Sequence, residues 1–312
     1  MNSWRLQPVS FKFQISDYCF WKANLLMQVT QKKLGDAEEQ QFESLLPSEG
    51  LAFSSQGFLI RSLPVSKARP KLSRLGDYYC YIPLTYQHCY IDLSTGFENY
   101  QQKFSSKTRS SLRRKLKKYA KHSGGDICWK SYHKPDEIND FFKHARQVSE
   151  LTYQEKLFDG GIPGDPEFIN NSHDLASKGE VRAYVLFDGT RPVSYLFCPV
   201  KESVAIYSYL GYDPSYSNFS VGTVLQWLAI EQMFDDEDLK YFDFTEGQSH
   251  HKQQFATHQR QCANIYFIKR SFRNKIIILS QIFLDNFSGF IGDFLDRYGI
   301  KTKVKHLLRG TG

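Results

Sequence analysis

The order of strands and helices between residues 127 and 268 constrains the fold of this chain more than any other feature. Apolar residues recur there with strand or helix periods in nine segments, and Asp188-Gly189 between two of them is a strong β-hairpin signal. The predicted strands are Ile127–Tyr132, Val181–Phe187, Pro192–Val200, Ser203–Tyr212, Tyr241–Phe244 and Ala263–Ile268. The predicted helices are Pro135–Leu151, Asp165–Lys178 and Ser220–Phe234. This order predicts an α/β (α+β) domain.

The N-terminal third of the chain also has a mixed α/β pattern. Strands are predicted at residues 11–15, within Leu51–Pro64 on both sides of a turn at Ser54–Gly57, at Tyr78–Leu84 and at Cys89–Leu93. Phe20–Lys33 is predicted to be helical. No repeat or low-complexity linker separates this region from the rest of the chain.

Basic residues are concentrated in two segments of the 312-residue chain, whose formal charge is +7. Residues 103–121 contain nine Lys and Arg and no Asp or Glu, and residues 269–312 contain nine basic against three acidic side chains. Residues 122–268, in contrast, contain 12 basic and 21 acidic side chains. Such a distribution indicates a specific anionic partner rather than a uniformly basic surface.

The first basic segment is predicted to form a helix that begins at Ser105 or Ser106 and ends at Gly124-Gly125. Its apolar positions recur with a helical period and are expected to face the body of the protein. The cations expected on another face are Arg109, Arg113, Lys117 and Lys121. This face is either a solvated surface or the contact for an anion: donor phosphates, an acidic carrier protein, or a nucleotide-linked or lipid-linked sugar.

The second basic segment follows an amphipathic pattern near the end of the chain. The apolar residues that recur at about heptad spacing are Ile276, Leu279, Phe283, Phe287, Phe290 and Phe294. The basic residues that follow are Lys301, Lys303, Lys305 and Arg309. We favour a helix packed on its own domain, and interfacial association with a membrane is the alternative.

Several features of the sequence indicate a cytoplasmic protein without a metal site. The six cysteines show no CxxC spacing, the first thirty residues have no signal-peptide pattern, and no apolar run approaches 18 residues. Spacings typical of zinc sites, serine-hydrolase elbows and nucleotide-binding glycine loops are also missing. We therefore expect cytoplasmic localisation, with peripheral contact at the inner membrane surface left open.

Three motifs within about residues 100–269, more than half of the chain, carry a resemblance to a known family. They are Phe104–Lys118, then Tyr209–Tyr216 with Phe219–Gly222, and then Phe242–Gly247 followed by His251-Lys252. In order and spacing they resemble the GNAT acyltransferases, and within these the CelD-like, FemAB-related acetyltransferases encoded with exopolysaccharide pathways. The resemblance implies a GNAT fold with a mixed central sheet flanked by helices. It also implies three parts: a degenerate GNAT-like domain (1–102), the acyltransferase domain (103–270) and amphipathic basic helices (271–312).

The resemblance implies where an acyl thioester donor binds. In the GNAT fold the pantetheine lies where two parallel strands splay apart, and the pyrophosphate rests on the N-terminus of the next helix. Here those strands would be Ser203–Tyr212 and Tyr241–Phe244. The residues implied to hold the donor are Ser220, Val221, Gly222 and Thr223. The phosphate-binding turn of GNAT proteins usually begins with Gln or Arg and carries two small residues. When the turn is aligned on Gly222, this chain has Ser217 and Ser220 at the first two of these positions.

The chemistry of amine acylation requires a base for the amine and a proton for the leaving thiolate. The candidates for the base are Asp243, Glu246 and His251. Glu246 is preferred because it stands beside Gly247 in a loop at the expected mouth of the cleft. Asp243 could instead cap the following turn, and His251 could be a surface histidine.

Two further groups of residues complete the expected site. Tyr209 and Tyr212 lie on the strand expected to face the thioester and are the candidates for protonating the thiolate. The candidates for binding an anionic substrate are Arg109, Arg113, Lys117 and Lys252.

The resulting hypothesis is an N-acyltransferase that uses acetyl-CoA or another acyl-CoA and acts on an amine of a sugar or polysaccharide precursor. The first alternative is a FemAB-like transferase of aminoacyl or long-chain acyl groups from aminoacyl-tRNA or acyl carrier protein. The second alternative is a nucleic-acid-binding protein that uses the helix at 103–121. It ranks last because the body of the protein is acidic and no groove-reading motif follows.

Overall fold

The structure is a computed structural model that describes residues 4–15, 18–32, 34, 46, 50–52, 54–66, 69–152, 161–246 and 250–297. For residues 15, 18, 250 and 289–297 it describes the backbone only. The chain forms two compact units: residues 1–88 with 260–312 make unit 1, and residues 89–259 make unit 2. The chain passes between them within strands β6 (Thr85–Asp92) and β13 (His258–Lys269). The boundaries expected at residues 102 and 270 stay predictions.

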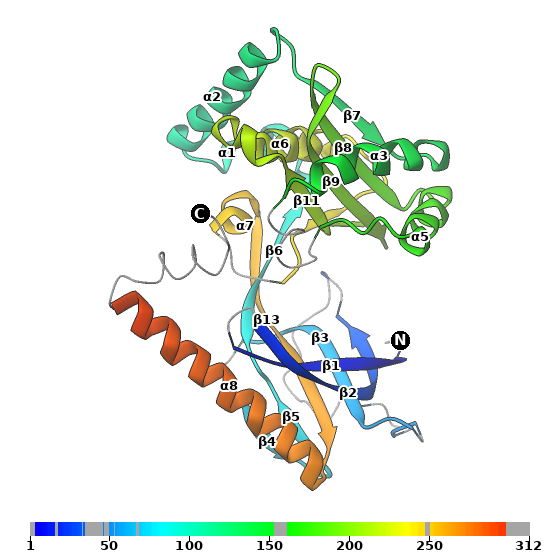
Figure 1. Cartoon of the computed structure of the whole chain (residues 1–312), viewed down its shortest axis with the longest axis vertical. Coiled ribbons are helices and arrows are strands. Elements are labelled where there is room, and N and C mark those ends of the chain that lie inside the picture. Colours follow the sequence, from blue (N-terminus) through cyan, green and yellow to red (C-terminus); the bar gives the residue numbers. More distant parts are fainter. Residues whose placement is uncertain are drawn as a thin grey trace. The chain divides into compact units, whose positions relative to one another are not determined.

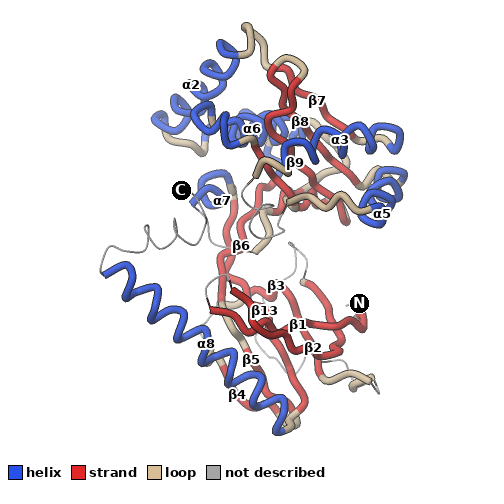
Figure 2. Tube along the Cα trace, in the orientation of Figure 1, coloured by secondary structure: helices blue, strands red, loops and turns tan. Residues whose placement is uncertain are grey.

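Unit 1 is a mixed sheet covered by one long helix (Figures 1 and 2). Its elements, besides its parts of β6 and β13, are β1 (Arg5–Ile15), β2 (Tyr18–Gln31), β3 (Gly57–Pro64), β4 (Leu72–Leu75), β5 (Tyr78–Tyr81) and α8 (Phe272–Arg297). The strand order is β1-β2-β3-β13-β5-β4; β2 and β3 pair in parallel, and the other neighbours in this order pair antiparallel. Ile277 and Ile278 of α8 are buried against apolar side chains of β1 and β2.

The helix predicted at Phe20–Lys33 is wrong, because residues 20–31 belong to strand β2, and Lys33 lies outside the described residues. Alternate residues from Ala23 to Val29 are buried, which is the period of a strand. β2 pairs with β1 from Tyr18 to Val29 and with β3 from Gln28 to Gln31. Pairing with two neighbours therefore outweighs a local pattern that also fits a helix. Of the two strands expected within Leu51–Pro64, the described residues form one, β3.

Unit 2 has helices on both faces of a mixed sheet (Figure 1). Its further strands are β7 (Cys128–Tyr132), β8 (Val181–Asp188), β9 (Arg191–Lys201), β10 (Val204–Ile206), β11 (Tyr209–Tyr212) and β12 (Tyr241–Asp243). Its helices are η2 (Leu93–Thr95), α1 (Phe97–Gln102), α2 (Ser106–His122), η3 (Pro135–Glu137), α3 (Ile138–Ser149), α5 (Pro166–Ser177), η4 (Pro214–Phe219), α6 (Val221–Phe234) and α7 (His250–Phe255). The strand order is β6-β12-β10-β9-β8-β7, with β11 also beside β9.

The two faces of the unit 2 sheet have separate cores, so the predicted α/β class with a mixed sheet flanked by helices is confirmed. Side chains of α1, α2 and α6 pack on one face, and those of α3 and α5 pack on the other. The alternation along β8 serves both cores, because Tyr184 and Leu186 face the first and Ala183 and Val185 face the second. Since both faces are covered, β8 is apolar along almost its whole length.

Candidate active site

The central strands of unit 2 part from one another directly before α6. β10 pairs in parallel with β12 from Val204 to Ile206, and the Tyr207 N–H still donates to the Asp243 carbonyl at 2.9 Å. β11, which follows, pairs with β9 instead. The strand expected over Ser203–Tyr212 is therefore two strands, of which β10 pairs with β12 and β11 pairs with β9. Beyond Tyr207 the backbone groups of β11 and β12 do not hydrogen-bond to each other.

The helix that follows the separation begins with a constrained turn. Ser220 has φ 55° and ψ 40°, a left-handed conformation that costs energy for a residue other than glycine. The first N–H groups of a helix generally favour an anion, although in α6 the Thr223 N–H already donates to the Ser220 carbonyl at 2.9 Å. A Cβ at Gly222 would lie 3.3 Å from Leu210 Cδ2 and 3.4 Å from Tyr212 Cδ1, so the start of α6 approaches β11 closely.

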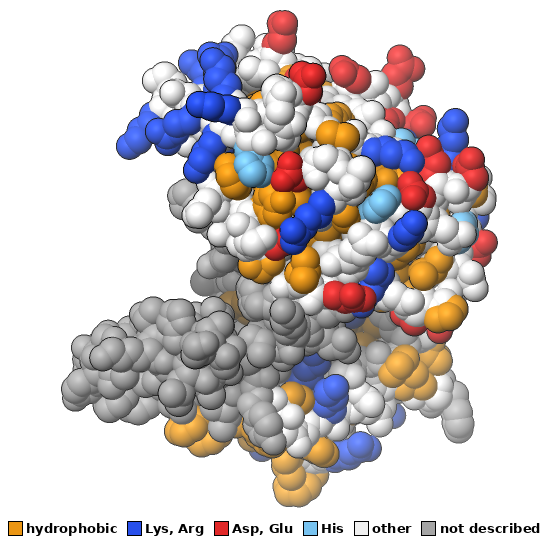
Figure 3. Space-filling model, turned by 45° about the horizontal axis from the view of Figure 1, so that its top comes forward, with side chains coloured by type: hydrophobic (Ala, Val, Ile, Leu, Met, Phe, Trp, Pro, Cys, Tyr) orange, Lys and Arg blue, Asp and Glu red, His pale blue; other side chains and the backbone are white. Residues whose placement is uncertain are grey.

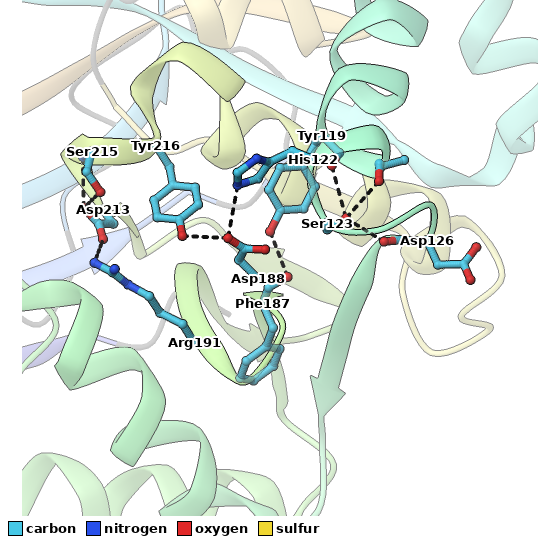
Figure 4. A network of polar contacts seen from close by, with 11 residues as sticks. Tyr119, His122, Ser123, Asp126, Phe187, Asp188, Arg191, Asp213, Ser215 and Tyr216 are labelled. Atoms are coloured by element: carbon cyan, nitrogen blue, oxygen red, sulfur yellow. Dashed lines mark hydrogen bonds and ion pairs between the residues drawn. The ribbon is translucent and has the colours of Figure 1, made fainter.

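A network of polar contacts fixes η4, the turn that leads into α6 (Figure 4). The Asp213 carboxylate accepts hydrogen bonds from the Ser215 N–H at 2.9 Å and the Ser215 hydroxyl at 2.7 Å, and pairs with Arg191 at 2.6 Å. Burial alone would raise the pKa of Asp213, but these hydrogen bonds and the guanidinium outweigh it and lower the pKa. Asp213 therefore caps η4 as a carboxylate.

The hairpin turn between β8 and β9 holds the other end of η4. The Asp188 carboxylate accepts from the Tyr216 hydroxyl at 2.7 Å and lies 3.1 Å from His122 Nε2 of α2 (Figure 4). The His122 ring also stacks on Phe219, with ring centroids 4.2 Å apart. The second motif of the sequence thus encodes a turn whose shape is set by contacts with α2 and the β8–β9 hairpin.

A cluster of polar side chains surrounds the end of β12. Asp243 is 7% exposed, and its Oδ1 accepts from the Thr245 N–H at 2.7 Å, so it does cap the following turn. Lys252 of α7 donates to the Glu246 carbonyl at 2.8 Å. Burial lowers the pKa of Lys252, while the carboxylates of Asp243 and Glu246 act in the opposite direction. The Glu246 side chain itself is exposed.

Two residues that the sequence did not single out belong to the same cluster. The buried thiol of Cys89 on β6 interacts electrostatically with Lys252, Asp243 and Lys103, and burial raises its pKa. Lys103 donates to the carbonyls of Gln254 and Ala256 at the end of α7. Burial of its ammonium group lowers the pKa of Lys103 to about 8.

His251 is held by a glutamine that sequence reasoning missed. His251 Nε2 lies 2.5 Å from Oε1 of Gln226, which is fully buried in α6. Because the amide oxygen only accepts, this contact places a proton on Nε2. In the neutral ring the lone pair is then on Nδ1. Nε2 of Gln226 has no hydrogen-bond partner among the described residues. The sequence signal that could have identified Gln226 is its place as a polar side chain within the apolar run of α6.

The two candidate tyrosines lie on opposite faces of β11. Tyr209 packs against the rings of Phe168 and Phe197 in the core beneath α3 and α5. Tyr212, 40% exposed, lies beside Gly222 on the α6 side. Strand geometry gives this result directly, since residues three apart point in opposite directions. The structure therefore places Tyr212, and not Tyr209, next to the start of α6.

The basic helix forms as predicted, and its cations remain available. Ser105 caps it, accepting from the Thr108 N–H at 3.2 Å, and Leu112 and Tyr119 are buried beneath it. Arg113 and Lys117 are exposed, whereas Arg109 donates to the Phe104 carbonyl at 3.0 Å. No Lys or Arg of α2 forms an ion pair with any residue in the described ranges. Figure 3 shows these side chains gathered on the surface over α2.

Comparison with known protein families identifies the domain that contains this arrangement. Residues 106–253 match the family model of the acetyltransferase (GNAT) domain. Residues 106–253 therefore form a GNAT acetyltransferase domain. The protein is therefore an acyltransferase, and the parting of β11 from β12 lies within this GNAT domain.

The solved structure of FemX shows the same fold at low sequence identity. The chain is similar to FemX, with 11% identity, a TM-score of 0.53, and 85% of this chain and 88% of FemX covered. It is also similar to L-PGS from Bacillus licheniformis, with 12% identity, a TM-score of 0.48, and 88% of each chain covered. No curated protein sequence matches the chain. The narrower CelD-like assignment within the GNAT family stays a prediction.

Proposed function

We propose that the GNAT domain transfers an acyl group, acetyl from acetyl-CoA in the leading case, to an amine of a sugar or polysaccharide precursor. The separation of β11 from β12 directly before η4 and α6 carries this proposal. A pantetheine arm fits there as an added strand, because the facing backbone groups do not pair with each other. The N-terminus of α6, with Val221, Gly222 and Thr223, then meets the pyrophosphate.

The reaction requires one bond to form and one to break at the thioester carbonyl. The acceptor nitrogen attacks the carbonyl carbon and loses a proton, and the carbon–sulfur bond breaks to release the thiol. Asp243 ends the strand at which the gap opens, and its position supports the role of base best. Glu246 and His251 are the alternatives, and Gln226 would set the tautomer of His251.

The other proposed roles follow from position on the two faces of β11. Tyr212 lies on the α6 side and is the proposed donor of a proton to the leaving thiolate. Tyr209 would instead support β11 from the opposite core. Lys252, Arg109, Arg113 and Lys117 are proposed to bind anionic groups of the donor or acceptor. Cytoplasmic localisation and a role in exopolysaccharide synthesis belong to the same proposal.

A second donor class is favoured by two observations. Ser220 occupies a left-handed position that glycine would adopt without strain, and the cations of α2 have no ion-pair partners among the described residues. An acyl carrier protein or an aminoacyl-tRNA, as the FemAB resemblance implies, presents a larger anionic surface than coenzyme A does. The alternative is therefore aminoacyl or long-chain acyl transfer by the same GNAT domain.

Thermal shift measurements on the full chain test both donors. A ligand that binds only the folded state raises the unfolding midpoint by mass action. We expect acetyl-CoA to raise it, with release of free thiol when an amino sugar is added. A rise only with acyl carrier protein or aminoacyl-tRNA would favour the second donor class. If none of these donors changed the midpoint, the proposed function would be contradicted.

A further inference from the structure

Helix α8 of unit 1 has two apolar faces, and only one of them is packed. The packed face contains Ile277 and Ile278, and Gln281 on the same side donates to the Lys12 carbonyl of β1 at 2.9 Å. The other face carries five large apolar residues with exposed fractions from 41% to 82%. These residues, which we call the α8 stripe, are Phe272, Ile276, Leu279, Phe283 and Phe287.

The α8 stripe is continuous along the helix. At about 100° per residue its five members fall within an arc of roughly 80°, almost opposite the packed face. The rings of Phe283 and Phe287 stack with centroids 6.0 Å apart, so adjacent turns present one apolar surface. Single exposed apolar residues are normal, but a contiguous stripe marks a surface for a partner.

Charge identifies the kind of partner. Arg273 and Lys275 are exposed and lie about 80° on either side of the α8 stripe. Unit 1 as a whole contains 20 basic and 10 acidic residues. An apolar helix face flanked by cations is the pattern of a helix that lies in the interface of an anionic membrane.

A second element of unit 1 has the same character. Phe20 and Trp21 of β2 are 52% and 56% exposed, and aromatic side chains of this kind favour the membrane interface. No helix in the described part of the chain is long and apolar enough to cross a membrane. The surface therefore suits contact with a bilayer and not insertion through it.

We propose that the α8 stripe docks on an anionic lipid membrane, with Arg273 and Lys275 at the headgroups. From the sequence alone, packing on the domain and membrane association were alternatives for this segment. Because α8 has a packed face and an opposite exposed face, both can occur together. This proposal does not depend on acyl transfer, since no residue of the GNAT domain takes part in it. A cytoplasmic transferase bound in this way would be held near lipid-linked acceptors.

Vesicle flotation of the full chain tests the proposal. We expect the protein to float with vesicles of phosphatidylcholine mixed with phosphatidylglycerol, and less with phosphatidylcholine alone. Phe283→Ser combined with Phe287→Ser should reduce binding about 10-fold or more, because two apolar side chains lose their burial in the interface. The matched control is Leu151→Ser, an exposed leucine of unit 2, which should bind as the unsubstituted protein does.

A second variant keeps the test independent of folding defects in the first. Arg273→Glu combined with Lys275→Glu should reduce binding to the anionic vesicles, and raised salt should reduce the binding of the unsubstituted protein in the same direction. Absence of binding to anionic vesicles would overturn the proposal, as would equal binding by the Phe283/Phe287 variant. A dimer seen by light scattering that this variant dissociates, without vesicle binding, would identify the α8 stripe as a self-association surface and also overturn it.

Discussion

Unit 1 and unit 2 expose different chemistry to their surroundings. Nine of the eleven large hydrophobic side chains that are exposed among the described residues lie in unit 1, which is the smaller unit. Unit 2 exposes two, and instead carries the exposed cations of α2 and the polar cluster at the end of β12. The proposed surface for a partner therefore lies in unit 1, and the proposed catalytic site lies in unit 2. Substitutions in the two units should therefore have different consequences.

The largest expected effect is on the chemical step in unit 2. Asp243→Asn keeps the shape of the side chain but removes the proposed base, so kcat should fall about 10²–10⁴-fold. The affinity for the donor should change little, and steady-state kinetics with calorimetric donor binding separate the two quantities. Asp174→Asn, an exposed aspartate on α5, is the matched control and should have no effect. An Asp243→Asn enzyme with unchanged kcat would transfer the role of base to Glu246 or His251.

The next effect is on stability, through the turn that leads into α6. Asp213→Asn removes the charge that Arg191 contacts and should lower the free energy of unfolding by about 1–2 kcal/mol at pH 7. Because the folded pKa of Asp213 is lowered, its contribution is present above the unfolded value of about 3.9 and is lost as pH falls below it. Urea unfolding at pH 7 and near pH 3 should show the difference from the unsubstituted protein shrink. A difference that does not change with pH would contradict the charged cap.

A smaller effect is expected on donor binding at the start of α6. A methyl group at Gly222→Ala would crowd Leu210 and Tyr212 and the expected path of the donor, so the Kd for acetyl-CoA should rise about 10-fold. The contrasting variant is Ser220→Gly, which relieves the left-handed strain and should bind the donor at least as well. Calorimetry measures both. If both variants weakened donor binding equally, the turn would influence donor binding only through its backbone conformation.

The smallest effect concerns the exposed cations of α2. Reversing Arg113 and Lys117 to Glu should raise KM for the donor or acceptor a few-fold, about 3–10-fold at low salt, because exposed charges are screened by solvent. The same reversal at Arg273 and Lys275 in unit 1 should leave KM unchanged when acceptors are not membrane-bound. If neither kinetics nor donor binding changed in the α2 variant, this helix face would be a solvated surface.

The strongly patterned parts of the sequence determined most of unit 2. The cap at Ser105, the apolar side of α2, the hairpin at Asp188-Gly189 and the helices α3, α5 and α6 follow from local signals that act within a few residues. The family motifs led to the acetyltransferase domain for the same reason: their residues set local turns such as the Asp213 cap. β2 is the opposite case, because its state depends on two strands that pair with it, one of them nearly thirty residues away in sequence.

The tertiary structure alone decided which side chains meet. No local pattern brings Gln226 to His251, or Lys103 and Lys252 to Cys89, because these pairs join segments far apart in sequence or in different elements. It also gave α8 a packed face and an exposed one. Local sequence determined most of the secondary structure of the GNAT domain and the concentration of charge in two segments, since both depend on neighbouring residues, but not the division of the expected strand Ser203–Tyr212 into β10 and β11. Long-range packing decided the geometry of the polar cluster and the exposure of the α8 stripe.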